Sequence, residues 1–206
     1  MKSNDYHDYV IKEGEFIGRF EEMYQNCNDP WPETEDELNV LSPSLKTKQI
    51  VKDEKFKHIL SAGTGKGLYL NWLRDNNQTK QFTGVEISKT CIEKCKKKYS
   101  FINLVHDNIA DYLRYKNPQF DLIIFREIIW YILDDWYGIC DILKSKHQGK
   151  HIIVELSFYH EQKYGAAYFN GPDEFINRFP FLIKEIVRQQ QTNKTDESFV
   201  MIYAEI

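Results

Sequence analysis

The sequence has no excess of basic residues, because 27 lysines and arginines face 31 aspartates and glutamates and the formal net charge is −4. A dedicated nucleic-acid-binding domain usually carries a basic patch or stripe, so the composition argues against a nucleic-acid partner. No apolar run approaches the roughly 18 residues that cross a bilayer. The first residues also lack the apolar stretch of a signal peptide. We therefore expect a cytoplasmic protein with no membrane partner.

Cysteine is scarce, with 4 residues in 206. Cys91 and Cys95 have helical spacing, and no second Cys/His pair follows at the distance of a zinc finger. We expect reduced thiols with structural roles and no metal site.

Hydrophobic residues make up 42% of the chain, which is enough for one buried core. Short apolar runs alternate with amphipathic segments, as in parallel α/β sheets. The runs that predict strands span residues 58–62, 82–87, 102–106, 120–125, 152–156, 181–188 and 198–206. The last two are joined by a polar stretch too short for a crossover helix, which favours an antiparallel hairpin. We predict an α/β, Rossmann-like, seven-stranded and mostly parallel sheet with one antiparallel C-terminal strand and helices on both faces.

The helical periodicity is clearest in two places. Ser88 is placed to cap a helix that runs to Tyr99, and the apolar residues from Ile128 to Leu143 predict one face of a long helix. The first 50 residues are different in character. We predict one or two amphipathic helices between residues 6 and 24, and an exposed Trp31 between two prolines. We divide the chain into an N-terminal helical extension or lid, residues 1–50, and a single-domain core, residues 51–206.

Glycine is also scarce, yet three of the 10 glycines stand at positions 63, 65 and 67, directly after the first strand. Glycines there permit a sharp turn and a close approach of a ligand to the main chain, although such a run can also be a simple structural turn. Gly67 follows Lys66 where a phosphate-binding loop needs Ser or Thr, which excludes an ATPase or GTPase. Leu68 stands where the dinucleotide fingerprint has Gly or Ala, which disfavours an NAD enzyme. Glu86 ends the second strand, where a carboxylate accepts hydrogen bonds from ribose hydroxyls and repels a 2′-phosphate.

With these features the chain resembles the class I S-adenosylmethionine-dependent methyltransferases over roughly residues 55–206. More narrowly, the segments Asp29-Pro30-Trp31 and 126–132 are similar to the nodulation-protein-S-like branch of small-molecule enzymes. The resemblance implies that S-adenosylmethionine is the cofactor. The residues that it implies for cofactor binding are Ser61, Gly63, Thr64, Gly65, Gly67, Glu86, Ile87, Asp107, Asn108, Ile109 and Arg126.

The chain departs from the family at Ser61, where an acid usually helps to hold the cationic amino group of the cofactor. A hydroxyl accepts a hydrogen bond but supplies no opposite charge, a loss of about 1 to 3 kcal/mol in a semi-buried site. Either Glu127 or another acid compensates, or cofactor binding is weak. A second hypothesis is therefore a binding or regulatory protein that kept the fold and lost activity.

The candidates for the acceptor side follow the fourth and fifth strands, because open α/β sheets bind ligands beyond the carboxyl ends of their strands. We expect Glu127, His160 and Tyr131 to be catalytic, although Glu127 could also cap a helix or hold the cofactor and His160 could be a surface residue. The expected substrate-binding residues are Trp31, Tyr24, Trp130 and Tyr159. We expect a small-molecule substrate, a sugar or sugar nucleotide methylated on oxygen or nitrogen, and a monomer or homodimer.

Overall fold

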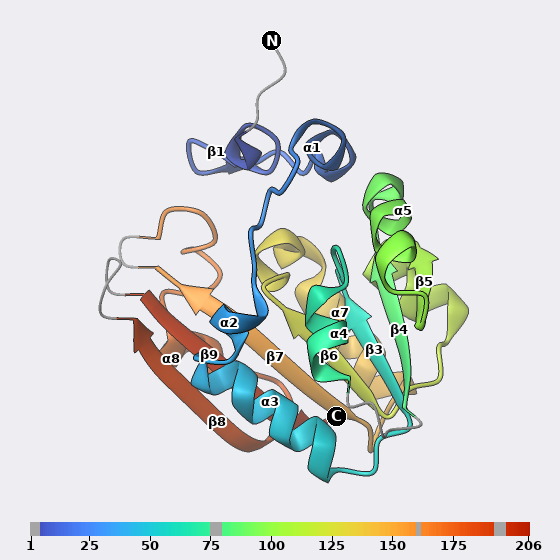
Figure 1. Ribbon diagram of the computed structural model, residues 1–206. Helices are drawn as coiled ribbons and strands as arrows, with labels where there is room; N and C mark the ends of the chain where they lie inside the picture. Colours follow the sequence, from blue (N-terminus) through green and yellow to red (C-terminus); the bar gives the residue numbers. More distant parts are fainter. Residues whose placement is uncertain (1–4, 75–79, 160–161, 192–196) are drawn as a thin grey trace.

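The computed structural model describes residues 5–74, 80–159, 162–191 and 197–206 (Figure 1). Its centre is a seven-stranded sheet with the order β5-β4-β3-β6-β7-β9-β8. The strands are β3 (His58–Ala62), β4 (Gln81–Glu86), β5 (Ile102–His106), β6 (Leu122–Arg126), β7 (His151–Phe158), β8 (Leu182–Gln191) and β9 (Glu197–Glu205). The first five of these are mutually parallel where they pair, whereas β9 runs antiparallel to both β7 and β8. The predicted sheet, with its one reversed C-terminal strand, is confirmed.

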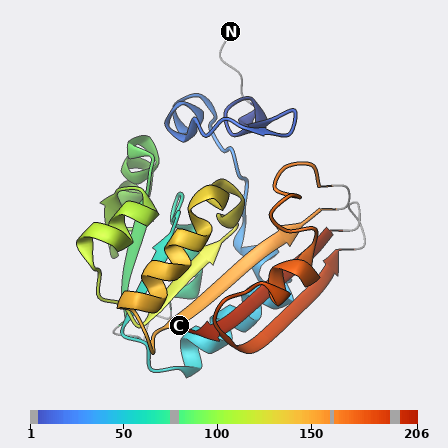
Figure 2. The same cartoon turned by 180° about the vertical axis from the view of Figure 1, so that it is seen from behind.

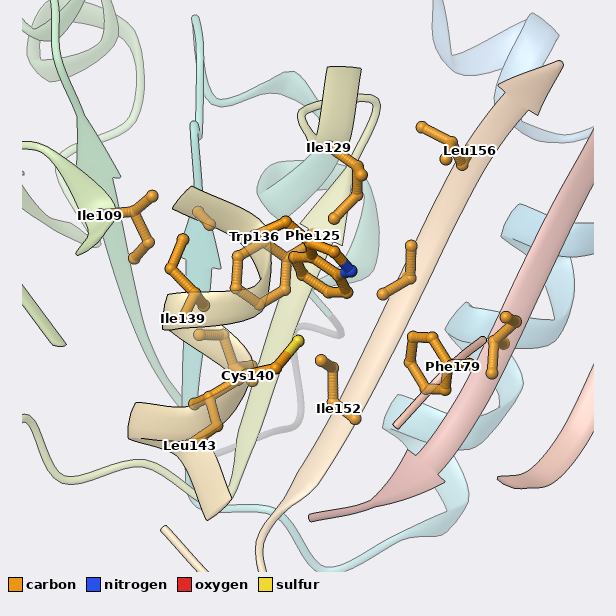
Figure 3. Close-up of a cluster of buried hydrophobic side chains, with 14 of the residues drawn as sticks. Ile109, Phe125, Ile129, Trp136, Ile139, Cys140, Leu143, Ile152, Leu156 and Phe179 are labelled. Atoms are coloured by element: carbon orange, nitrogen blue, oxygen red, sulfur yellow. The ribbon is translucent and has the colours of Figure 1, made fainter. Parts of the chain in front are cut away.

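Helices cover both faces of the sheet (Figures 1 and 2). Those of the core are α3 (Ser42–Asp53), α4 (Leu68–Leu73), α5 (Lys89–Lys98), α6 (Ile109–Asp111), α7 (Leu133–Lys146) and α8 (Pro172–Asn177). Along β6 the side chains alternate, so that Ile123 and Phe125 enter one hydrophobic cluster and Ile124 the other. The ring of Phe125 meets Trp136 of α7 edge to face, with 5.5 Å between the centroids (Figure 3). The strand is therefore apolar throughout because both of its faces are buried.

Two local predictions about helices were wrong. The long helix begins at Leu133 and not near Ile128, because Glu127 has a left-handed φ of 53° and a separate helical turn, Ile129–Tyr131, follows it. The segment between residues 6 and 24 also contains a small hairpin, β1 (Ile11–Lys12) with β2 (Glu15–Phe16). Glu13 and Gly14 have positive φ values of 55° and 86° and form its turn, which interrupts the predicted helices.

A helical turn (Tyr6–Asp8) and α1 (Phe20–Asn26) lie beyond the carboxyl ends of the parallel strands (Figure 1). An extended stretch leads from them down to α2 (Glu35–Leu38), which Thr34 caps and whose Leu38 packs into the core near α4. Residue 50, the expected boundary, falls within α3, which contacts β7, β8 and β9. None of the described helices is long and apolar enough to cross a membrane.

Candidate active site

The loop between β3 and α4 has the tight backbone that its glycines predict. Gly63, Gly65 and Gly67 have positive φ values of 60°, 54° and 83°. A β-carbon on Gly63 would lie 2.3 Å from Cδ1 of Ile128, and one on Gly67 would lie 2.5 Å from Sγ of Cys95. Side chains at these two positions are therefore excluded both by the backbone conformation and by close neighbours.

Thr64 fixes this loop to the neighbouring strand. Its amide donates a hydrogen bond to the carbonyl of Val85 at 3.1 Å. Its side chain occupies the space beside Gly84, where an added β-carbon would lie 2.6 Å from Cγ2 of Thr64. The Thr64 hydroxyl oxygen is buried and has no hydrogen-bond partner within the described ranges, so it leaves one polar group of the loop unsatisfied.

Glu86, at the end of β4, faces the glycine loop directly. Its Oε2 accepts a hydrogen bond from the Gly65 amide at 3.0 Å, and its Oε1 accepts one from the Ser88 amide at 2.9 Å. Burial raises the pKa of this carboxyl, and the amide donors oppose that shift. The Ile87 amide also acts as a donor to this carboxyl, so three of its roughly four acceptor positions are used and one is left for a ligand hydroxyl.

The residues after β5 lie next to Glu86. The Asp107 amide donates to the Glu86 carbonyl at 3.2 Å, and the Asp107 carboxylate accepts from the Asn108 amide at 2.9 Å. The Asn108 side chain caps α6, and Ile109 belongs to the hydrophobic core. Ile87, by contrast, keeps 48% of its surface exposed. The two residues here that offer side-chain surface to a ligand are thus Asp107 and Ile87.

Glu127 stands at the carboxyl end of β6, held from two sides. Its amide donates to the Glu155 carbonyl at 2.9 Å, and its Oε1 accepts from the Ser157 hydroxyl at 2.7 Å. Burial raises the pKa of Glu127 to about 6, against the lowering effect of the Ser157 hydrogen bond and the Arg126 charge. The pKa of Tyr131 is raised by burial and then by the Glu127 charge. The pKa of Glu127 is therefore close to neutral pH, where a carboxyl group can both take up and release a proton.

Arg126 points into a buried polar cluster in place of the predicted cofactor contact. Its Nε donates to the fully buried Glu155 at 3.0 Å, and its Nη2 pairs with Glu33 of the N-terminal segment. Glu155 also accepts hydrogen bonds from the hydroxyls of Ser44, Thr47 and Tyr69. The sequence analysis did not single out Glu155, whose only signal is an acid in the middle of an apolar strand.

Aromatic side chains of the N-terminal segment cover Tyr131. The Tyr131 ring lies 5.3 Å from that of Phe20, 6.1 Å from that of Trp31 and 6.4 Å from that of Phe16. Trp31 also meets Tyr24 edge to face, with 5.7 Å between the centroids. Trp31 is therefore half-buried within an aromatic cluster and is not the exposed residue that its prolines suggested.

The remaining expected residues do not all gather here. Trp130 is buried in the core, where its indole nitrogen donates to the Ser157 carbonyl at 2.9 Å. Tyr159 is 51% exposed, and His160 lies outside the described residues. Ser61 is buried within β3, between Gly84 of β4 and Ile124 of β6 in the register of the sheet.

Comparison with known proteins bears on this arrangement. Residues 60–149 match the family model described as a methyltransferase domain. This match contains the glycine loop, Glu86, Asp107 and Glu127. None of the curated proteins compared with the chain matches it.

Solved methyltransferase structures share the fold. The N-methyltransferase NodS from Bradyrhizobium japonicum is 14% identical, with a TM-score of 0.58 over 83% of this chain and 98% of its own. An rRNA methylase from Streptococcus thermophilus is 14% identical, with a TM-score of 0.56 over 81% and 99%. The plantazolicin methyltransferase BpumL, solved in complex with SAH, is 11% identical, with a TM-score of 0.54 over 78% and 80%. At these identities the likeness establishes the fold, and the differing names show that it does not settle the acceptor.

Proposed function

We propose that the chain is a class I S-adenosylmethionine-dependent methyltransferase that methylates a small polar metabolite; the methyltransferase-domain match over residues 60–149 and the shared fold of solved methyltransferases support this. The observation that carries the proposal is the approach of the Gly65 amide to the Glu86 carboxylate, 3.0 Å apart. It joins a glycine-rich loop to a buried carboxylate at the end of β4. A small-molecule enzyme of the nodulation-protein-S-like branch is the narrower form of the same proposal.

The residues present fit an adenosyl cofactor. Gly63, Gly65 and the unsatisfied Thr64 hydroxyl form the loop that would hold its amino-acid half. Glu86 would accept a hydrogen bond from a ribose hydroxyl, while Ile87 and Asp107 would contact the adenine. S-Adenosylmethionine, when bound, would supply the methyl group from its sulfonium, and its sulfur would leave as the neutral thioether of S-adenosylhomocysteine.

The missing acid at Ser61 leaves the cationic amino group of the cofactor without its usual partner. Replacing it is one role open to Glu127, because Ile128, the next residue, packs against Gly63. A carboxylate at this position would restore the opposite charge from the neighbouring strand β6. The role that we favour for Glu127 is on the acceptor side, and its contact with Ser157 and its electrostatic interaction with Tyr131 support that role.

The chemistry left to the protein is alignment, exclusion of water and removal of a proton. Glu127 would take the proton of an acceptor hydroxyl or amine while the Ser157 hydroxyl holds its carboxylate in place. Tyr131 and Trp31 would form apolar walls that keep water from the transfer. His160 stays a prediction as a second polar residue facing the acceptor.

A sugar would suit a site beside this aromatic cluster, because flat aromatic side chains such as Trp31 and Tyr131 stack against sugar rings. The sugar nucleotide is the less favoured form, since its phosphates need a cation. The nearby Arg126 is already paired with Glu155 and Glu33, and Lys66 is paired with Asp29. A neutral sugar is therefore the acceptor that we favour.

The N-terminal extension would serve as a lid. We define the lid segment as residues 6–34, which ends before α2. Its Tyr24 hydroxyl lies 3.5 Å from the position that a β-carbon on Gly65 would take, so this side chain covers the glycine loop.

Titration calorimetry with S-adenosylmethionine and its demethylated product tests the proposal. We expect both to bind, and absence of heat at millimolar ligand would contradict it. Release of the demethylated product during incubation with a panel of neutral sugars, amino sugars and sugar nucleotides then distinguishes an active enzyme from a catalytically inactive binding protein. Cofactor binding with no turnover on any acceptor would favour the inactive alternative.

A further inference from the structure

One carboxylate of the lid segment, Glu21 of α1, accepts three hydrogen bonds from the core. Its Oε2 accepts hydrogen bonds from the Ser88 hydroxyl at 2.6 Å and from the Thr90 amide at 3.1 Å. Its Oε1 accepts one from the Thr90 hydroxyl at 2.7 Å. All three donors belong to the first turn of α5 or its cap, so Glu21 binds the lid to the helix that follows β4.

This attachment is directly continuous with the cofactor site. Ser88 donates its hydroxyl to Glu21 and its amide to Glu86, at 2.6 Å and 2.9 Å. The same short segment therefore carries the acid expected to hold the ribose and the anchor of the lid. Opening of the lid would break the contact between Glu21 and the Ser88 hydroxyl, and the amide of the same Ser88 is hydrogen-bonded to Glu86.

The charge of Glu21 is matched to this position. Burial raises its pKa, but the hydrogen bonds from Ser88 and Thr90 prevail and lower the pKa to about 2. The side chain is thus an anion at neutral pH, at the amino-terminal end of a ten-residue helix. Its hydrogen bonds are of the strong, charge-assisted kind.

The closed lid covers the residues expected to hold the cofactor. Glu86 is only 5% exposed. The buried side chain of Tyr24 covers Gly65, since its hydroxyl lies 3.5 Å from the position of a β-carbon there. Entry and release of an adenosyl compound consequently require the lid to move.

We propose that Glu21 is the latch of this lid: its contacts with Ser88 and Thr90 hold residues 6–34 closed and set the rate at which the adenosyl cofactor exchanges. The proposal rests on cofactor binding at Glu86, as argued above. Glu21 is a positioning residue, because it acts through Ser88 and the lid and does not touch the expected ligand. A latch slows both directions of exchange, since entry and release pass through the same open state.

Stopped-flow measurement of S-adenosylhomocysteine binding tests the latch. Glu21→Gln removes the negative charge, so the hydrogen bonds from Ser88 and Thr90 are no longer charge-assisted and weaken, and we expect kon and koff both to rise by about tenfold. The Kd should change much less than either rate constant. Glu22→Gln is the matched control, because Glu22 is exposed on the same helix and, within the described part of the chain, its ion pair is the local one with Arg19, at 3.6 Å.

The result that overturns the latch is a Glu21→Gln protein whose rate constants match those of Glu22→Gln, or whose koff rises without kon. Thr90→Val removes one hydroxyl donor with little change in shape and should move both rate constants in the same direction; it decides the question if Glu21→Gln does not fold. Failure of the wild-type protein to bind S-adenosylhomocysteine would contradict the proposed function. Binding with unchanged exchange rates would contradict the latch alone.

Discussion

Replacing Glu127 by glutamine should stabilise the protein at neutral pH. Burial raises the pKa of this carboxyl from the ordinary value of 4.5 to about 6. The folded state therefore holds the proton more tightly than the unfolded state, and this contribution to stability is fully present below pH 4.5 and lost as the pH rises through 6. A difference of about 1.5 pH units corresponds to about 2 kcal/mol. Glutamine cannot ionise and can still accept the Ser157 hydrogen bond, so it avoids this loss.

Thermal unfolding of both proteins between pH 4 and pH 8 measures the effect. At pH 4 the two Tm values should agree, whereas at pH 8 the Glu127→Gln variant should unfold about 4 to 8 °C higher, given about 2 to 4 °C per kcal/mol for a chain of this size. Turnover should move in the opposite direction. Loss of a general base lowers the rate by about 100-fold or more, and the rise of wild-type kcat/KM with a midpoint near pH 6 should disappear. Cofactor affinity should be nearly retained.

Each result has an outcome that would refute the reasoning. Equal Tm values at pH 8, or a lower value for the variant, would show that the folded protein does not disfavour the ionised carboxyl. Lost cofactor affinity with an unchanged rate for the bound complex would move Glu127 from the acceptor side to the amino group of the cofactor, where Ser61 leaves a charge unmatched. Glu22→Gln controls for the change in net charge, since Glu22 is exposed on α1.

Three further changes probe the site and its support. Glu86→Gln should weaken S-adenosylmethionine binding by about tenfold or more in calorimetry, because an amide loses acceptor positions for the ribose; unchanged affinity would place the ribose elsewhere. Gly67→Ala should lower the free energy of unfolding in urea by about 2 kcal/mol or more, since the left-handed backbone and Cys95 both oppose a β-carbon; wild-type stability would contradict this close approach. Glu155→Gln should cost about 3 to 5 kcal/mol by the same assay, because it leaves the buried Arg126 without its main partner; a loss below about 1 kcal/mol would show that Glu33 suffices.

The sheet could be predicted from the sequence because its strands are short apolar runs separated by turn-forming residues. β6 is buried on both faces, so it has a continuous apolar signal, and the hairpin of β8 and β9 follows from the short polar connection between them. The start of α7 could not be predicted in the same way. Ile128 and Ile129 fit the helical period of the residues after Leu133, but they face the core from a turn that the positive φ of Glu127 creates. A helical repeat of apolar residues shows which side chains are buried. It does not show whether those residues belong to one uninterrupted helix.

The geometry of the candidate site was predictable where it depends on neighbouring residues. The glycines directly after β3 predict a tight loop, and the position of Glu86 at the end of β4 predicts a carboxylate at the same edge of the sheet. The contacts that support them join residues far apart in the chain, such as Glu21 with Thr90 and Glu33 with Arg126. No spacing rule connects such pairs, because which surface carboxylate meets which donor depends on how the lid lies on the core.

Arg126 illustrates the same limit and its consequence for charge at the site. Its place at the end of β6 suggested a contact with the cofactor, but Glu155 and Glu33 take its hydrogen bonds, and the Tyr69 ring lies 4.6 Å from its guanidinium. The positive charge of Arg126 is therefore neutralised by Glu155 and Glu33 and is not available to the expected ligand. If Glu86 and Glu127 bind the cofactor and acceptor as proposed, they would give the site the negative character that favours a sulfonium cofactor and its amino group, even though Ser61 contributes no charge.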